Sequence, residues 1–314
     1  MVSSHPMIEL RRLHRFFGDT RAVNDISFEV PRGEVFGYIG PNGAGKTTSM
    51  RILATLELPT YGDAYVDGFS VVNDPDRVRR RLGFMPDFYG TYANVNCLEY
   101  LDFFARAHGL VGRERHRALQ YTMSFTKLDE LAEKPIRGLS KGMKQRLCLG
   151  RAMIHDPAVL ILDEPAAGLD PRARIELRVM IRELAANGKS ILVSSHILTE
   201  LAEMCDRVGI IERGELLATG SVDDIQREQR THREVKMRVL ENAPAAAEWL
   251  RRREGITHVL EDGALLKFSH IGEREDEAAL LRELILADFA VAEFASHSRS
   301  LEDVFMQVTK GRVQ

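Results

Sequence analysis

The feature that most constrains this chain of 314 residues is the glycine-rich segment GPNGAGKT at Gly40–Thr47. It fits the pattern G-x-x-x-x-G-K-[ST], in which successive backbone N–H groups wrap phosphates and the lysine neutralises their outer oxygens. Residues 34–39 (EVFGYI) are typical of a short buried strand, and residues 46–56 (KTTSMRILATL) of a helix whose N-terminal dipole attracts anions. The sequence therefore predicts an α/β fold with a nucleotide-binding turn.

Within that turn, glycines let the backbone approach a phosphate where a Cβ would block it. Lys46 is expected to reach the outer phosphates, and Thr47 places a hydroxyl where Mg²⁺ should sit. The residues that we expect to contact the nucleotide here are Gly40, Pro41, Asn42, Gly43, Ala44, Gly45, Lys46, Thr47 and Thr48.

Two adjacent carboxylates follow a second apolar run, residues 158–162 (AVLIL). Such a run suits a central parallel strand, and ligand-binding residues in parallel sheets lie at the carboxyl ends of strands. Asp163 is therefore placed to hold Mg²⁺, through water. Glu164 is placed to orient or deprotonate a water that attacks the phosphate.

A histidine follows a third predicted strand, residues 190–194, and precedes a predicted helix at residues 197–204. An isolated histidine at such a turn is often a helix cap or a surface residue. His196, however, lies at the carboxyl end of a core strand, where its ring could reach a γ-phosphate and the water behind it. We interpret His196 as a catalytic partner of Glu164.

The segment LSKGMKQR at residues 139–146 precedes a predicted helix from Lys141 to about Ile154. Taken by itself, Ser140 is a helix N-cap. Its hydroxyl, the small Gly142 and the positive end of the helix also suit a phosphate. This segment has no use for a nucleotide held in its own subunit, but it suits one held by a facing copy.

Together these segments resemble the nucleotide-binding subunit of ATP-binding cassette (ABC) transporters, over about residues 8–220. The phosphate loop, the LSKGM signature, the Asp163-Glu164 pair, the AGLD loop ending at Asp170 and His196 occur in the order typical of that family. The resemblance implies a P-loop NTPase cassette with a mostly parallel core sheet, antiparallel N-terminal strands and a helical subdomain at about residues 88–155. In that family, two subunits sandwich two ATP molecules and drive a separate membrane permease.

Under this resemblance, Ser140 and Gly142 would bind the ATP of the facing subunit, and Asp170 would join the nucleotide site. An aromatic residue before an N-terminal glycine commonly stacks on adenine in this family, and Phe17 matches that place. A core phenylalanine is nearly as good an interpretation of Phe17.

One position departs from the family pattern. Asp87 stands after the predicted strand LGFM (82–85), where the family usually has glutamine. An aspartate can bind Mg²⁺ or its water, but it adds a negative charge and removes an amide donor. Metal coordination would involve Thr47, Asp163 and Asp87, and the loop of Asp87 would couple the site to a membrane partner.

The chain's organisation predicts two domains: residues 1–220 with the nucleotide site, then a connector (221–233) and an accessory domain (234–314). The accessory domain reads as β-α-β-β-α-β with a last helix at residues 300–308, typical of a small ferredoxin-like α+β module. Its SLEDVF segment at residues 300–305 resembles the C-terminal extension of drug- and antibiotic-resistance exporters of the daunorubicin-resistance type. In the helical insertion, Tyr100, Phe103 and Phe104 have helical spacing and are expected to pack in the core, with partner contact as the alternative.

Composition excludes several classes of function. The net charge is −3 and no long Lys/Arg block indicates nucleic-acid binding. The three cysteines lack CxxC spacing, which argues against a zinc site. No apolar run approaches the ~20 residues needed to span a bilayer, so we expect a cytoplasmic chain held on the inner face of the membrane by its permease.

Three functions are compared. The leading one is an ATPase subunit that works as a homodimer and powers export through a separately encoded permease. A second function is that of a soluble cassette protein in DNA repair, chromosome structure or translation. Three features oppose it: the chain has one cassette, the 94 positions from Lys46 to Ser140 leave no room for a long coiled coil, and zinc-type cysteine pairs are absent from the sequence. The third function is a nucleotide sensor with little turnover. The presence of Glu164 opposes it, because loss of that carboxylate is the simplest way to make such a site inert. The transported substrate and the choice between export and import stay open.

Overall fold

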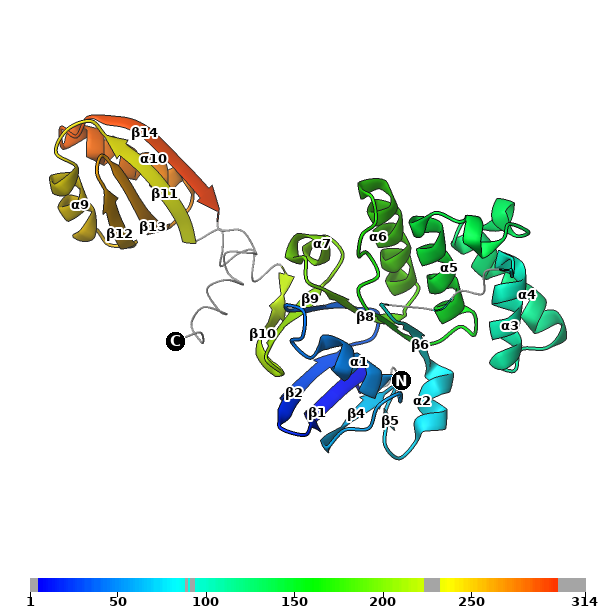
Figure 1. The fold of residues 1–314 in the computed structure, drawn as a ribbon. Coiled ribbons are helices and arrows are strands. Elements are labelled where there is room, and N and C mark those ends of the chain that lie inside the picture. The colour runs from blue at the N-terminus through cyan, green and yellow to red at the C-terminus, as the bar shows by residue number, and fades with distance from the viewer. Residues whose placement is uncertain (1–4, 88–89, 91–93, 223–231, 299–314) are drawn as a thin grey trace. The chain divides into compact units, whose positions relative to one another are not determined.

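The computed structural model describes residues 5–87, 90, 94–222 and 232–298. The chain divides into two compact units, residues 1–220 and 221–314. The predicted helix at residues 300–308, with its SLEDVF segment, lies outside the described residues, as does most of the predicted connector. The ribbon in Figure 1 labels the elements of both units.

The centre of the first unit is a six-stranded sheet. Its strands are β3 (Val35–Ile39), β6 (Leu82–Met85), β7 (Val159–Leu162), β8 (Ser190–Ser195), β9 (Arg207–Glu212) and β10 (Glu215–Ser221), in the order β10-β9-β3-β8-β7-β6. The strands from β9 to β6 pair in parallel. Every residue of β3 and β7 is buried, as expected for central parallel strands.

Parallel pairing brings the carboxyl ends of these strands to one edge of the sheet. The phosphate loop follows β3, Asp163 and Glu164 follow β7, and His196 follows β8. Asp87 lies two residues beyond the end of β6. Residues more than 100 positions apart in the chain are therefore gathered at one edge.

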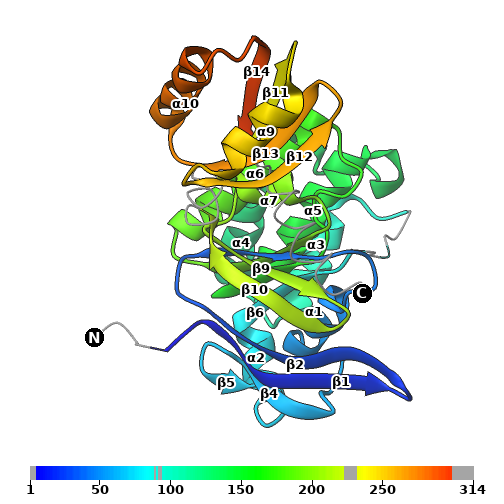
Figure 2. The ribbon, with the colours of Figure 1, turned by 90° about the vertical axis from the view of Figure 1, so that its left-hand side faces the viewer.

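A second, antiparallel sheet covers the first. It comprises β1 (Ile8–Phe17), β2 (Thr20–Val30), β4 (Tyr61–Val66) and β5 (Phe69–Ser70), in the order β2-β1-β4-β5. Helix α1 (Lys46–Leu53) packs against β2 and β4 (Figures 1 and 2). Its buried Met50 and Leu53 join the core that links the two sheets. The helix ends three residues before the predicted Leu56, since Thr55 adopts a left-handed conformation with φ 59°.

The predicted helical subdomain consists of helices between β6 and β7. They are α3 (Cys97–Ala107), α4 (Gly112–Phe125), the short 3₁₀ turns η1 (Asp129–Leu131) and η2 (Ile136–Gly138), and α5 (Lys141–Met153). A capping box between Asn96 and Glu99 starts α3. Tyr100 is buried and packs edge-on against Phe104, but Phe103 is 56% exposed. The prediction of core packing was therefore wrong for Phe103, which lies on the outer side of α3.

The described part of the first unit contains three further helices: α2 (Pro75–Arg81), α6 (Pro171–Ala186) and α7 (Leu198–Ala202). Helix α7 is shorter at both ends than the predicted helix at residues 197–204. Helix α6 begins at the cap residue Asp170, directly after the AGLD loop. The first unit is thus an α/β cassette with both a parallel core sheet and an antiparallel N-terminal sheet.

The second unit is the predicted β-α-β-β-α-β module. Its elements are β11 (His232–Val239), α9 (Ala243–Arg251), β12 (Ile256–Asp262), β13 (Leu265–Ile271), α10 (Arg274–Leu286) and β14 (Val291–Ser298), with sheet order β12-β13-β11-β14. Its own core contains Met237, Leu250 and Phe268. Strand β11 begins at His232, inside the segment predicted as connector.

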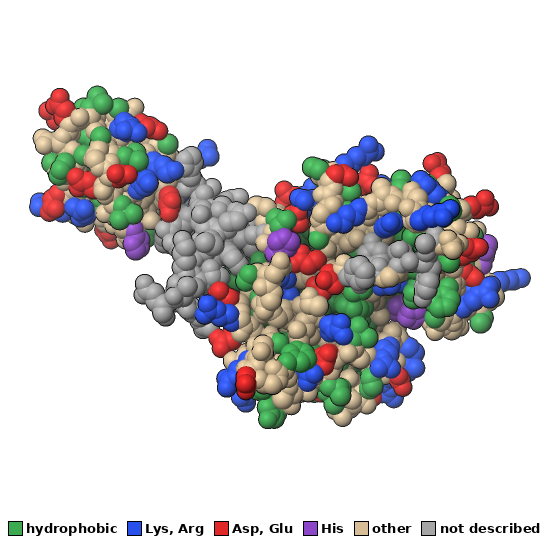
Figure 3. Space-filling model, viewed as in Figure 1, with side chains coloured by type: hydrophobic (Ala, Val, Ile, Leu, Met, Phe, Trp, Pro, Cys, Tyr) green, Lys and Arg blue, Asp and Glu red, His purple; other side chains and the backbone are tan. Residues whose placement is uncertain are grey.

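Charged side chains of both signs are interspersed over the face shown in Figure 3. Among the described residues, no helix is both long enough and apolar enough to span a membrane.

Candidate functional site

The phosphate loop is threaded closely between other backbone segments. Gly45 has φ 107°, and a Cβ there would lie 2.2 Å from the carbonyl oxygen of Ala22. A Cβ on Gly40 would lie 2.2 Å from the carbonyl oxygen of Ile211. Only glycine fits either position, so the turn keeps its backbone available at the N-terminus of α1.

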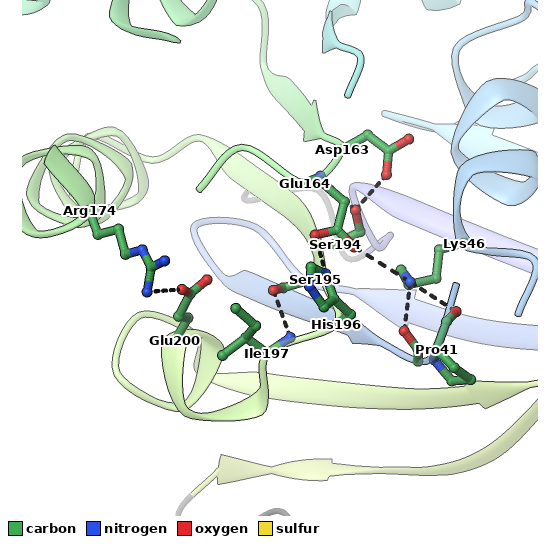
Figure 4. A network of polar contacts seen from close by, with 11 residues as sticks. Pro41, Lys46, Asp163, Glu164, Arg174, Ser194, Ser195, His196, Ile197 and Glu200 are labelled. Carbon is green, nitrogen blue, oxygen red and sulfur yellow. Dashed lines mark hydrogen bonds and ion pairs between the residues drawn. The ribbon is translucent and has the colours of Figure 1, made fainter. Parts of the chain in front are cut away.

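Lys46 reaches back over this loop. Its ammonium donates to the carbonyl oxygens of Gly40, at 2.6 Å, and Pro41, at 3.2 Å. It also lies 3.5 Å from Oε1 of Glu164, and its side chain is only 6% exposed. The lysine therefore joins the phosphate loop to the carboxylate pair (Figure 4).

Ser194 joins the Asp163 carboxylate to the backbone of Glu164. Its hydroxyl donates to Oδ1 of Asp163 at 2.5 Å and accepts from the backbone N–H of Glu164 at 2.8 Å. Sequence reasoning missed Ser194. The available signal was a polar residue near the end of an otherwise apolar strand, which is most easily explained when a buried partner lies opposite.

Asp163 is fully buried, and its Oδ2 has no hydrogen-bond partner among the described residues. Burial raises the pKa of Asp163; hydrogen bonding from Ser194 and Thr47 opposes this, and the charges of Asp87 and Glu164 raise it further. In the part of the chain that the structure describes, no three His, Cys, Asp or Glu side chains lie close enough together to hold a metal ion. A buried carboxylate oxygen without a partner, on a carboxylate that the Thr47 hydroxyl also bonds, still suits a hard divalent cation. Thr47 and Asp163 therefore fit Mg²⁺, and Asp87 acts on Asp163 through its charge.

Glu164 pairs with His196 on the side of the site that is exposed to solvent. Oε2 of Glu164 lies 2.9 Å from Nδ1 of His196, whose side chain is 45% exposed. Glu164 itself has φ 47°, a left-handed conformation that is uncommon for a residue other than glycine. This turn directs the carboxylate between the Lys46 ammonium and the His196 ring, as Figure 4 shows.

The signature residues lie in a separate cleft of about 310 Å³, whose lining includes Ser140, Gly142 and Asp170 but no residue of the phosphate loop. Ser140 caps α5 and accepts from the N–H of Met143 at 3.3 Å, while Asp170 caps α6 and accepts from the N–H of Ala173 at 2.9 Å. Two helix N-termini therefore converge on this cleft.

Gln145 connects this cleft to the carboxylates. Its Nε2 donates at 2.5 Å to the carbonyl oxygen of Pro165, which follows Glu164 directly. Sequence reasoning did not single out Gln145, since an amide within a basic helix carries no distinctive signal.

Phe17 lies apart from both clusters, at the end of β1. Its side chain is 46% exposed, and the Arg15 guanidinium lies over its ring at 4.4 Å from the centroid. The alternative of a core phenylalanine is therefore wrong, and a ring that is partly exposed is compatible with stacking on a base.

A phosphate loop, a carboxylate pair and a histidine at the edge of a parallel sheet define a P-loop nucleotide-binding ATPase. Residues 23–167 match the family model for the ABC transporter domain, and residues 220–309 match the C-terminal domain of DrrA1-3-like ATP-binding proteins. The chain belongs to the family of ABC transporter ATP-binding proteins. The predicted family, its drug-resistance branch and the fold class are confirmed.

Two curated relatives and one solved structure illustrate the similarity. The chain is 37% identical over 220 residues to the probable multidrug ABC transporter ATP-binding protein YbhF of Escherichia coli K12, covering 70% of this chain but only 38% of YbhF. It is 39% identical over 214 residues to the Nod factor export ATP-binding protein I of Burkholderia lata, covering 68% of this chain and 70% of that protein. The structure of an ATP-binding subunit of an ABC transporter aligns with TM-score 0.64 and 32% identity, over 71% of this chain and 92% of its own.

Proposed function

We propose that this chain hydrolyses ATP to power export through a membrane permease that is a separate polypeptide. The observation that carries the proposal is the cluster of Lys46, Asp163, Glu164 and His196 at one edge of the sheet. The similarity to a Nod factor export protein and to DrrA1-3-like proteins supports export, and a carboxylate at Glu164 supports turnover.

In the proposed reaction, the oxygen of a water attacks the γ-phosphorus of ATP and the bond to the β-phosphate oxygen breaks, which releases ADP and phosphate. Glu164 takes the proton of the attacking water, and His196 holds that carboxylate through Oε2. Lys46, which contacts loop carbonyls and Glu164, would turn to the phosphates, leaving Oε1 of Glu164 for the water.

Mg²⁺ would be held by Thr47 and Asp163, with Asp87 nearby, and would neutralise charge on the phosphate oxygens. Ser194 keeps Oδ1 of Asp163 occupied, so the unpartnered Oδ2 is the oxygen available to the ion or its water. The residues of the phosphate loop, Gly40 to Thr48, would supply the remaining nucleotide contacts, and Phe17 would stack on the base.

The separate cleft supports a dimer. Because the cleft of Ser140, Gly142 and Asp170 contains no residue of the phosphate loop, it would receive the ATP of a facing subunit. In a homodimer that closes on two ATP molecules, each ATP would lie between the phosphate loop of one subunit and the cleft of the other. It would sit on the inner face of the membrane through its contact with the permease.

Glu164→Gln tests the function. We expect ATP binding to be retained and turnover to fall roughly 10²- to 10⁴-fold, the range for loss of a general base. The matched control is Glu183→Gln, an exposed glutamate on α6 that should leave turnover unchanged. ATPase rates and equilibrium nucleotide binding are measured on both variants. If wild type binds ATP but its basal rate is no higher than that of Glu164→Gln, the low-turnover sensor replaces the ATPase.

A further inference from the structure

A ladder of three ion pairs connects α6 to the segment that follows His196. Its arginines are spaced four residues apart along one side of α6, and its acids come from α7 and the turn after it. The pairs are Arg174–Glu200, with N···O 2.7 Å, Arg178–Glu203, and Arg182–Asp206, also with N···O 2.7 Å.

Only the first pair of the ladder lies near the proposed catalytic residues. Glu200 follows His196 by four residues and its side chain is 12% exposed. Burial raises the pKa of Glu200; Arg174 and then His196 oppose this, and Glu164 raises it further. Glu200 and Glu164 are therefore two carboxylates in the electrostatic range of one histidine ring (Figure 4).

The surroundings leave the Glu200 side chain room to move. A cavity of about 220 Å³ lies between α6 and α7, and both Arg174 and Glu200 line it. Apolar packing does not fill this space, so the ion pair is the contact that decides where the carboxylate points. Arg178 also lines this cavity, but it pairs with Glu203. Without the Arg174 guanidinium, the positive charge left to act on Glu200 would be that of a protonated His196 ring.

We propose that Arg174 is a positioning residue for the hydrolysis reaction: by pairing with Glu200, it prevents this carboxylate from competing with Glu164 for His196. The inference rests on the proposed roles of Glu164 and His196. It differs from a simple tether, in which the ion pair would only fix α7 against α6, and the two models predict opposite results for one double variant.

The test compares Arg174→Ala, the double variant Arg174→Ala/Glu200→Gln and the control Arg182→Ala. The control loses an arginine from the same helix and a pair of the same length, two turns farther from the cap at Asp170. We expect Arg174→Ala to lower kcat about tenfold with KM for ATP changed less than about twofold, because the variant leaves the proposed nucleotide contacts of the phosphate loop in place. The double variant should recover to within about threefold of wild type, since no competing carboxylate remains.

A double variant as slow as Arg174→Ala overturns the inference in favour of the tether, and so does an equal loss in Arg182→Ala. A second measurement does not depend on turnover. The His196 ring proton signal, assigned in the NMR spectrum by its loss in His196→Ala, should move towards the imidazolium position in Arg174→Ala and return in the double variant.

The two measurements separate the inference from the proposed function. If His196→Ala hydrolyses ATP at the wild-type rate, the proposed role of His196 fails. The ring signal of His196 in Arg174→Ala still reports whether Arg174 keeps Glu200 away from that ring. An unmoved ring signal in Arg174→Ala overturns the inference even when Glu164→Gln behaves as proposed.

Discussion

The stacked pair His108–His155 makes the stability of the first unit sensitive to acid. The two rings lie 3.7 Å apart at an interplanar angle of 4°, and Nε2 of His155 lies 3.1 Å from the carbonyl oxygen of Leu82. Burial, followed by the charge of His108, lowers the pKa of His155 from 6.5 to about 4. Burial also lowers the pKa of His108. Both rings are therefore neutral in the folded protein at pH 7.

The sign and size of the effect follow from linkage. Because the folded-state pKa of His155 lies below its unfolded value, unfolding takes up a proton as the pH falls, and stability is lost between about pH 6.5 and 4. The full difference of about 2.5 pH units corresponds to about 3 kcal/mol, at 1.36 kcal/mol per unit. Integrated from pH 7.5 down to pH 5, the loss is about 2 kcal/mol.

The perturbation is His155→Phe, which keeps a ring for stacking on His108 but cannot be protonated. Urea unfolding followed by circular dichroism at pH 7.5 and pH 5 gives the loss of stability for wild type and variant. We expect the wild-type loss to exceed that of the variant by about 2 kcal/mol. His116→Gln, an exposed histidine on α4, is the matched control and should behave as wild type.

The single tryptophan supplies an internal control. Trp249 belongs to the second unit, so its fluorescence reports the unfolding of that unit and should show no effect of His155→Phe. Equal losses for wild type and His155→Phe between the two pH values would refute the stated cause, since acid sensitivity would then come from other groups.

The parts of the fold that the sequence predicted well are those set by local patterns. The turn Gly40–Thr47 has its strand and helix within a few residues on either side, and the apolar run before Asp163 is long enough to identify a buried strand. The order of strands and helices in the second unit was also predicted, because each element has its own apolar period and turn residues. Family motifs then led to the proposed function of residues that spacing alone would have left as helix caps, such as Ser140.

The contacts that the sequence did not predict join residues far apart in the chain. Ser194 lies 31 positions from Asp163, and the proposed partners Arg174 and Glu200 lie 26 positions apart on different elements. No periodicity within either element marks such pairs, because a hydrogen bond across two strand ends depends on register and backbone direction. The left-handed turn at Glu164 is of the same kind: its φ is set by the packing around it and not by the residue's own preference.

The remaining predictions concern the nucleotide and its metal. Lys46→Ala should abolish ATP binding by the monomer, because the phosphates lose their main positive partner, whereas Ser140→Ala should leave monomer binding intact and suppress dimer closure and hydrolysis. Equilibrium binding and ATP-dependent size exclusion distinguish the two, and equal loss of monomer binding in both would show that the signature acts within its own subunit. Asp87→Gln removes a charge that raises the pKa of Asp163, so it should keep the ATPase rate within about tenfold but raise the Mg²⁺ concentration for the half-maximal rate. Asp87→Ala should raise this Mg²⁺ concentration at least as much, because it removes the same charge and leaves no side-chain oxygen. A carboxylate close to the metal adds a negative charge to the site, so its removal must change the affinity of the site for a divalent cation. Identical Mg²⁺ titrations for wild type and both variants would therefore place Asp87 outside the metal shell.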